Sequence, residues 1–261
     1  MDDATLHKEF NKCCEPLFLV DAWMRHGHSE ATENGTLTYL KFEGRVYGVT
    51  CRHVVEAASP RMYAAVMHER TVWYFRSLDA EAGGYASTFR FPLLSNDEPD
   101  IAIHCFGSDM PSTQARKGKS PIDLDAWQEP VWSQVRLGAA VGYGTEHRSR
   151  FEDKVRAPML VVTATLCNSI DVDSKQMVFS DQLAAPHGTF FSGMSGGPIF
   201  VDDGGENPKF AGIVFEGAPG SSAAWKKRDL DQSFIDGRDI VIYGVPVTPV
   251  RFREWVRSCG L

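Results

Sequence analysis

Ser195 lies in the stretch GMSGGP, residues 193–198, among three glycines and a proline. Glycines weaken strands and helices, so a cluster of them calls for a local reason. One reason is a sharp turn that exposes the serine hydroxyl and points backbone N–H groups at one place. The other is an ordinary glycine-rich hairpin. Because a serine hydroxyl is a poor nucleophile until a base takes its proton, the rest of the chain must decide between them.

The order of the histidines along the chain excludes one kind of serine chemistry. The stretch fits the G-x-S-x-G pattern of the α/β-hydrolases, but those enzymes place their histidine after the serine, and no histidine follows Ser195. The reverse order, histidine then aspartate then serine, has candidates in His53 and Asp100. His53 follows a β-type run, and Asp100 leads into an apolar Ile-Ala-Ile run. Asp97 is the alternative acid, but no such run follows it.

The elements that would position these residues are mostly strands. The runs 35–42 and 45–51 alternate around a short turn and predict a hairpin. Further β-type runs precede and follow a polar connector, 107–130, which is rich in Gly, Pro and Lys. Helices are expected only over 3–14 and over 248–258, where a threonine cap precedes a proline. Many short strands between turns indicate an all-β sandwich or barrel.

Composition narrows the function classes. The 261 residues are 43% hydrophobic and 23% charged, which is typical of a globular protein. A net charge of −7 without a long basic run argues against nucleic acid as a partner. No run approaches the roughly 18 apolar residues of a membrane span, so no membrane association is expected. The N-terminal stretch does not resemble a signal peptide. The six cysteines are therefore expected to be reduced thiols in the cytoplasm, with Cys13-Cys14 structural or, alternatively, redox-active.

Six segments together resemble the chymotrypsin/trypsin-like serine proteases, and within them the intracellular bacterial-type peptidases. They occur in the family's order between residues 35 and 258. The segments are VTCRHVV (49–55), DIAI (100–103), VGYGT (141–145), SGMSGGPIF (192–200), AGIVFEG (211–217) and VIYGVPVTPVRFREWV (241–256).

The resemblance implies an all-β fold with two antiparallel six-stranded β-barrels and a C-terminal α-helix. The expected order is an N-terminal extension (1–34), a first barrel (35–110), a connector (111–130), a second barrel (131–247) and the helix (248–261).

The resemblance also implies a serine endopeptidase that acts through an acyl-enzyme intermediate. His53 would be the general base, Asp100 would orient it, and Ser195 would be the nucleophile. The backbone N–H groups of Gly193 and Ser195 would form the oxyanion hole. The expected substrate-binding residues are Thr189, Phe190, Phe215, Glu216 and Gly217.

Met194 departs from the family pattern. Secreted relatives carry an aspartate there, which pairs with a new N-terminal ammonium after cleavage of a propeptide. Met194 cannot form this ion pair, so we expect regulation by a protein partner or ligand instead. No cofactor is expected. A metal site at His26 and His28 is considered and not expected, because no cysteine or acid stands at ligand spacing.

Specificity is less determined by the sequence. Thr189 is expected at the base of the primary pocket, Val241 nearby, and His187 either in the pocket or in a loop. Thr189 and Val241 are uncharged, and so are the expected walls of the pocket, which are Phe190, Phe215 and Gly217. A basic substrate side chain would find no acid there, so cleavage of a protein or peptide after small or medium uncharged residues is expected. Glu216 would face a neighbouring subsite. Two alternatives are a catalytically silent barrel that binds peptides or proteins, and an esterase.

Overall fold

The computed structural model describes residues 3–18, 34–56, 89–94, 98–107, 118–147, 149–151, 154–171, 173–219 and 237–261. The helices are α1 (Asp3–Lys12), the 3-10 helix η2 (Thr145–His147), α6 (Pro249–Ser258) and a helical turn at 52–56. The first strands are β1 (Cys14–Phe18), β2 (Asn34–Phe42), β3 (Arg45–Thr50), β4 (Ala102–Cys105) and β5 (Ile122–Asp123). The later strands are β6 (Leu137–Tyr143), β7 (Ser149–Phe151), β8 (Lys154–Arg156), β9 (Met159–Leu166), β10 (Met177–Gln182), β11 (Pro198–Asp202), β12 (Lys209–Ala218) and β13 (Asp239–Pro246).

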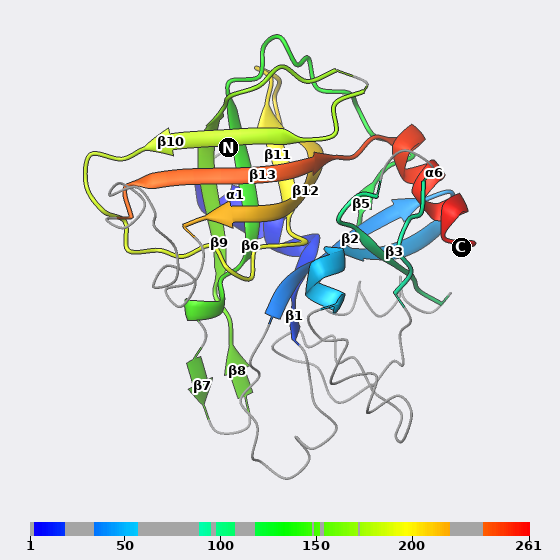
Figure 1. Cartoon of the computed structure of the whole chain (residues 1–261), viewed down its shortest axis with the longest axis horizontal. Helices are drawn as coiled ribbons and strands as arrows, with labels where there is room; N and C mark the ends of the chain where they lie inside the picture. Colours follow the sequence, from blue (N-terminus) through cyan, green and yellow to red (C-terminus); the bar gives the residue numbers. More distant parts are fainter. Residues whose placement is uncertain are drawn as a thin grey trace.

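The later strands close into a six-stranded barrel in the order β10-β13-β12-β11-β6-β9, with the β7–β8 hairpin outside it (Figure 1). Side chains in β9 alternate between exposed and buried, as a strand with one face on a core requires. Gly138 on β6 leaves room for the ring of Phe179, which a Cβ at that position would overlap. The prediction of a six-stranded second barrel is confirmed.

The first sheet is open in the part of the chain that the structure describes. Its order is β1-β2-β3-β4, and β5 pairs in parallel with β2. Two β-type runs, 70–78 and 87–94, could have added strands to this sheet. The first lies outside the described residues, and in the second Arg90 contributes an isolated bridge to Ile103. The predicted closure of a first six-stranded barrel is therefore not confirmed, because the sheet has five described strands and no pair among them closes it.

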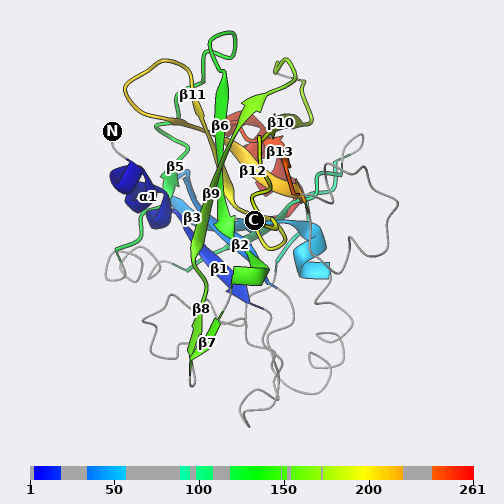
Figure 2. The ribbon, with the colours of Figure 1, turned by 90° about the vertical axis from the view of Figure 1, so that its left-hand side faces the viewer.

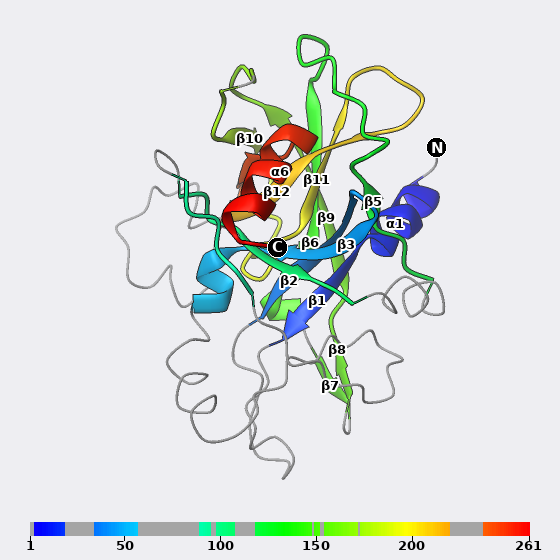
Figure 3. The same ribbon diagram turned by 90° about the vertical axis from the view of Figure 1, so that its right-hand side faces the viewer.

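The C-terminal helix α6 is confirmed, and it packs on the first sheet. The Thr248 hydroxyl accepts a hydrogen bond from the Arg251 N–H, and proline occupies the first turn. Phe252 and Trp255 are buried, and the Phe252 ring meets the ring of Phe42 edge-on at 5.5 Å. Their core cluster includes residues of both the sheet and the barrel, so the helix joins the two halves (Figure 3).

Residues 3–18 form an N-terminal arm, α1 and β1, that packs along the body (Figure 2). The arm belongs to the stretch 1–34, whose boundary as a separate extension stays a prediction. β1 pairs with β2 over its whole length, and its Pro16 is tolerated because β1 is at the sheet edge. Phe10 of α1 stacks on Phe200 of the barrel, with ring centroids 4.6 Å apart.

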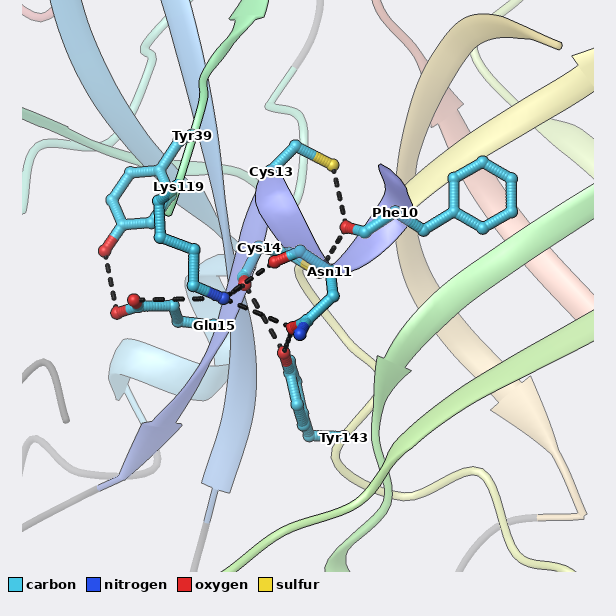
Figure 4. Close-up of polar contacts among 8 residues, drawn as sticks. All are labelled: Phe10, Asn11, Cys13, Cys14, Glu15, Tyr39, Lys119 and Tyr143. Atoms are coloured by element: carbon cyan, nitrogen blue, oxygen red, sulfur yellow. Dashed lines mark hydrogen bonds and ion pairs between the residues drawn. The ribbon is translucent and has the colours of Figure 1, made fainter. Parts of the chain in front are cut away.

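A buried polar cluster fixes the arm (Figure 4). The Lys119 ammonium donates to the carbonyl oxygens of Asn11 and Cys14, at 2.7 and 2.9 Å, and lies 3.9 Å from the Glu15 carboxylate. The Tyr39 hydroxyl donates to Glu15 at 2.9 Å. Burial, with the Glu15 charge beside it, raises the pKa of Tyr39 well above its ordinary value, which keeps that hydroxyl a donor.

The six cysteines are free thiols. A hydrogen bond with Cys14, together with burial, raises the pKa of the Cys13 thiol well above its ordinary value. Both thiols of this pair donate to the Phe10 carbonyl. This arrangement gives Cys13 and Cys14 a packing role at the end of α1. Among the described ranges, no helix has the length and hydropathy to cross a membrane.

Candidate active site

His53 and Asp100 meet at adjacent strand ends of the first sheet. β3 runs antiparallel to β4, with Thr50 opposite Ala102, so the residues just after β3 and just before β4 are neighbours. His53 Nδ1 lies 2.5 Å from Asp100 Oδ2, and the His53 backbone N–H donates to Asp100 Oδ1 at 2.9 Å. One carboxylate thus holds both the ring and the backbone of the histidine. Half of the His53 side chain is exposed, whereas 31% of Asp100 is.

Asp100 stays ionised although it is partly buried. Burial alone would raise the pKa of Asp100, but the hydrogen bonds from the ring and the backbone N–H of His53 favour the charged form. The net effect lowers the pKa of Asp100 below its ordinary value. An ionised carboxylate on Nδ1 makes that nitrogen the donor, which leaves Nε2 of the neutral ring as the basic nitrogen.

Ser195 lies in a tight loop, residues 191–197, that is named here the serine loop. Gly196 adopts a φ of +91°, in the left-handed region, and a Cβ there would overlap the Thr36 carbonyl oxygen. A Cβ on Gly197 would overlap the carbonyl oxygen of Val141. The glycines therefore let the backbone approach both the first sheet and the barrel, and this close approach is their local reason.

The serine loop and the histidine come together across Gly35 of β2. A Cβ on Gly35 would lie 2.7 Å from a methyl of Val54, the residue after His53, and 3.1 Å from the Ser195 carbonyl oxygen. The Thr36 N–H donates to that same oxygen at 2.8 Å. The structure thus brings the serine loop beside the His53 turn at the contact between sheet and barrel.

The serine hydroxyl is not bonded to the histidine in this structure. Ser195 Oγ donates to the carbonyl oxygen of Phe215 at 3.2 Å, and among the described contacts His53 and Ser195 share no hydrogen bond. The backbone N–H groups of Gly193 and Ser195 donate to no group in the described part of the chain. The role of these two N–H groups as oxyanion donors stays a prediction.

Comparison with solved structures assigns the fold. A thermostable serine protease, AL20, from an extremophilic microorganism aligns over 97% of this chain and 99% of its own, at 12% identity and a TM-score of 0.51. The chain has a trypsin-like serine protease fold. A Glu endopeptidase aligns over 97% of this chain and 92% of its own, at 15% identity and a TM-score of 0.49. No family model matches the sequence, and neither does any curated protein.

In this trypsin-like fold, the predicted binding strand contains a bulge. The register of β12 against β13 shifts between Val214 and Glu216, so Phe215 is the extra residue. The bulge turns the Phe215 carbonyl to the serine hydroxyl, and the Phe215 ring lies 6.0 Å from that of Tyr243. Glu216 is exposed, so the strand leaves its charge in solvent.

Thr189 and Phe190 precede the serine loop, and a histidine organises their turn. The Thr189 N–H donates to His187 Nδ1 at 3.0 Å, while the His187 ring stacks on Phe191 at 5.5 Å. Phe191 also faces Gly217, where a Cβ would lie 2.8 Å from the Cβ of Phe191. Gly217 thus contacts Phe191 directly, and Thr189 is linked to Phe191 through His187. Residues 220–236 lie outside the described residues, and the assignment of Thr189, Phe190 and Val241 to a pocket stays a prediction.

Cys51 is a neighbour of the histidine that sequence reasoning missed. Its Sγ and the ligand atoms of His53 and Asp100 lie within 4.8 Å of one another. The thiol is fully buried and donates to the Val214 carbonyl at 3.1 Å. Burial, with Asp100 close by, raises the pKa of Cys51 well above its ordinary value, which keeps it a neutral thiol. His26 and His28 lie outside the described residues.

Proposed function

We propose that the chain is a serine endopeptidase with a triad of Ser195, His53 and Asp100. The observation that carries the proposal is the carboxylate of Asp100, which binds both the Nδ1 and the backbone N–H of His53 beside the serine loop. A histidine held in this way presents Nε2 as a base. The trypsin-like fold adds support. In it, His53 and Asp100 belong to the first sheet, and Ser195 belongs to a loop of the barrel.

The proposed reaction needs one side-chain movement. Ser195 Oγ turns from the Phe215 carbonyl towards His53 Nε2, which takes its proton as the oxygen attacks a peptide carbonyl. His53 then gives that proton to the leaving amine, and Asp100 stabilises the imidazolium. The N–H groups of Gly193 and Ser195 stabilise the negative oxygen, and each such donor is worth about 3–4 kcal/mol in the transition state.

The proposed substrate is an extended segment of a protein or peptide. Its backbone would pair with Phe215, Glu216 and Gly217, as a strand adds to an exposed sheet edge. An uncharged pocket near Thr189 would favour small or medium uncharged side chains, because a cation there would be buried without a partner. Glu216, which is exposed, would favour a basic residue at a neighbouring subsite.

We further propose that activity does not depend on cleavage of the N-terminus. Met194 is fully buried among apolar side chains of the barrel, including Ile199 and Phe191, so its position is filled by packing instead of an ion pair. A partner or ligand would then be the means of regulation. Six free thiols support a reducing, cytoplasmic location, as in the intracellular bacterial-type relatives.

A catalytically silent binding module is the second candidate. The hydrogen bond from Ser195 to Phe215 favours it, because the hydroxyl is engaged away from the base. An esterase would share the same triad and oxyanion donors.

Labelling with a peptidyl phosphonate, read by intact mass, separates these functions. The endopeptidase incorporates one phosphonate at Ser195, and the Ser195→Ala variant with the same circular dichroism incorporates none. Profiling on a peptide library then separates a peptidase from an esterase that cleaves only activated esters. A wild-type protein that neither labels nor cleaves overturns the proposed activity in favour of the binding module. Dominant cleavage after Arg or Lys would overturn the proposed uncharged pocket alone.

A further inference from the structure

Three buried threonines of the first sheet are hydrogen-bonded where it meets the serine loop. Thr36 and Thr38 lie on β2 and Thr50 ends β3, and all three are fully buried. The Thr38 hydroxyl donates to the Gly196 carbonyl at 2.7 Å. The Thr50 hydroxyl donates to the Thr36 carbonyl at 2.8 Å. Hydroxyls, and not charges, therefore fasten the sheet to the loop.

Thr36 differs from the other two because it contacts two residues of the loop at once. Its N–H donates to the Ser195 carbonyl at 2.8 Å, and its hydroxyl donates to the Gly193 carbonyl at 2.9 Å. The same hydroxyl oxygen accepts the N–H of Tyr143 at 3.1 Å. A threonine hydroxyl has one hydrogen to give, and the Tyr143 N–H leaves that hydrogen for Gly193. The orientation of the hydroxyl is thereby fixed.

The strand β6 is shaped to allow this contact. A Cβ on Gly142 would lie 3.0 Å from Thr36 Oγ1 and 2.8 Å from Met194 Cα. Any side chain at this position would push the threonine and the serine loop away from β6. Three chain segments, one from the sheet, one from the barrel and the loop itself, therefore converge on one hydroxyl group.

The partner of that hydroxyl, Gly193, is a residue with high backbone freedom. Gly193 has a φ of +96°, and a glycine crosses between backbone conformations more readily than other residues. Its carbonyl and that of Ser195 are both engaged by Thr36, whereas the N–H groups of Gly193 and Ser195 donate to nothing in the described part of the chain. Met194, between them, cannot hold the loop by an ion pair.

We propose that Thr36 is a positioning residue for the oxyanion hole: its hydroxyl holds the Gly193 carbonyl, and so fixes the peptide unit that links the two units carrying the N–H donors of Gly193 and Ser195. The inference rests on the proposed function, because these donors serve catalysis only if Ser195 attacks a carbonyl. Thr36 itself acts through Gly193 and reaches no reacting atom. Its loss should therefore affect the transition state more than the binding of substrate.

The test removes the hydroxyl and little else. Thr36→Val is nearly isosteric and keeps the N–H bond to Ser195, Thr36→Ser keeps the hydroxyl, and Thr38→Val removes an equally buried hydroxyl that bonds to Gly196. The rate constant kcat and the KM of a peptide from the library profile are measured, with the affinity of a peptide boronic acid as a transition-state mimic. We expect Thr36→Val to lower kcat about 10- to 100-fold with KM within about threefold, somewhat less than the loss of a whole oxyanion donor.

The controls separate positioning from general stability. Thr36→Ser and Thr38→Val should stay within about threefold of wild type in kcat, and boronic acid affinity should fall only in Thr36→Val, in step with kcat. If Thr36→Val does not fold, Thr36→Ser against Thr36→Ala tests the same hydroxyl. The positioning role alone is overturned if the wild type is active and folded Thr36→Val is as active as Thr38→Val. Thr36→Ala replaces Thr36→Val in this comparison if the valine variant does not fold. A wild type that neither labels nor cleaves overturns the role together with the proposed function.

Discussion

The histidine side and the serine side of the candidate site are built by different means. His53 and Asp100 lie at partly exposed strand ends of a sheet that is open in the described residues, and the Asp100 side chain joins them. The serine loop is held by its own backbone groups, which bond to the Thr36 N–H and to buried threonine hydroxyls of the first sheet, and Gly196 and Gly197 are packed against other backbone. Changes on the histidine side should therefore alter chemistry with little effect on folding. Changes in the serine loop should first alter the fold.

Asp100→Asn gives the largest effect and tests the histidine side. The amide can accept the His53 backbone N–H, but it favours the wrong tautomer of the ring, so kcat should fall by about 10⁴-fold. The unfolding midpoint in urea should move little, because the hydrogen bonds at this edge are exposed to water. Peptidase assays and urea titrations measure the two effects. A variant that unfolds in proportion to its lost activity would contradict the contrast between the two sides.

Gly197→Ala gives the next largest effect and tests the serine side. Its new methyl would overlap the Val141 carbonyl, so the loop or β6 must move, and a loss of about 3 kcal/mol or more of unfolding free energy is expected. Gly118→Ala is the matched control, since Gly118 has a positive φ of +67° but open space around it. That variant should cost only about 1–2 kcal/mol. Gly118→Ala measures the cost of a methyl at a positive φ, which Gly197 does not have, so a loss in Gly197→Ala no larger than in Gly118→Ala would contradict the close packing of the loop.

The same contrast explains what the sequence could predict. The order of His53, Asp100 and Ser195 marked the candidate site because each lies in a local motif, and many short β-type runs between turns marked an all-β fold. Thr36 carries no such signal, because a threonine in a strand is ordinary and its partner Gly193 is 157 residues away.

Two further elements, one in each half of the molecule, also escaped the sequence pattern. β1 contains Pro16, which argues against a strand unless the strand lies at an edge, and the edge follows only from the final topology. The bulge at Phe215 depends on the pairing of β12 with β13, so the turn of its carbonyl towards Ser195 had no local mark. Both features come from contacts between strands, which a pattern within one strand does not contain.

The smallest effect is the pH dependence of stability that Asp100 contributes. Its pKa in the folded protein is lowered below the ordinary value of 3.8. Its charge therefore stabilises the fold fully above that value, and this contribution is lost as the pH falls through the lowered folded pKa. Asn cannot titrate, so only the wild type loses this contribution at low pH. The difference between the urea midpoints of wild type and Asp100→Asn should therefore be constant above about pH 5 and change below it. Asp171→Asn, at an exposed turn where Ser174 bonds to the carboxylate, is the control for a carboxylate outside the site. Parallel curves for wild type and Asp100→Asn from about pH 3 to 6 would mean that His53 does not favour the charged form of Asp100.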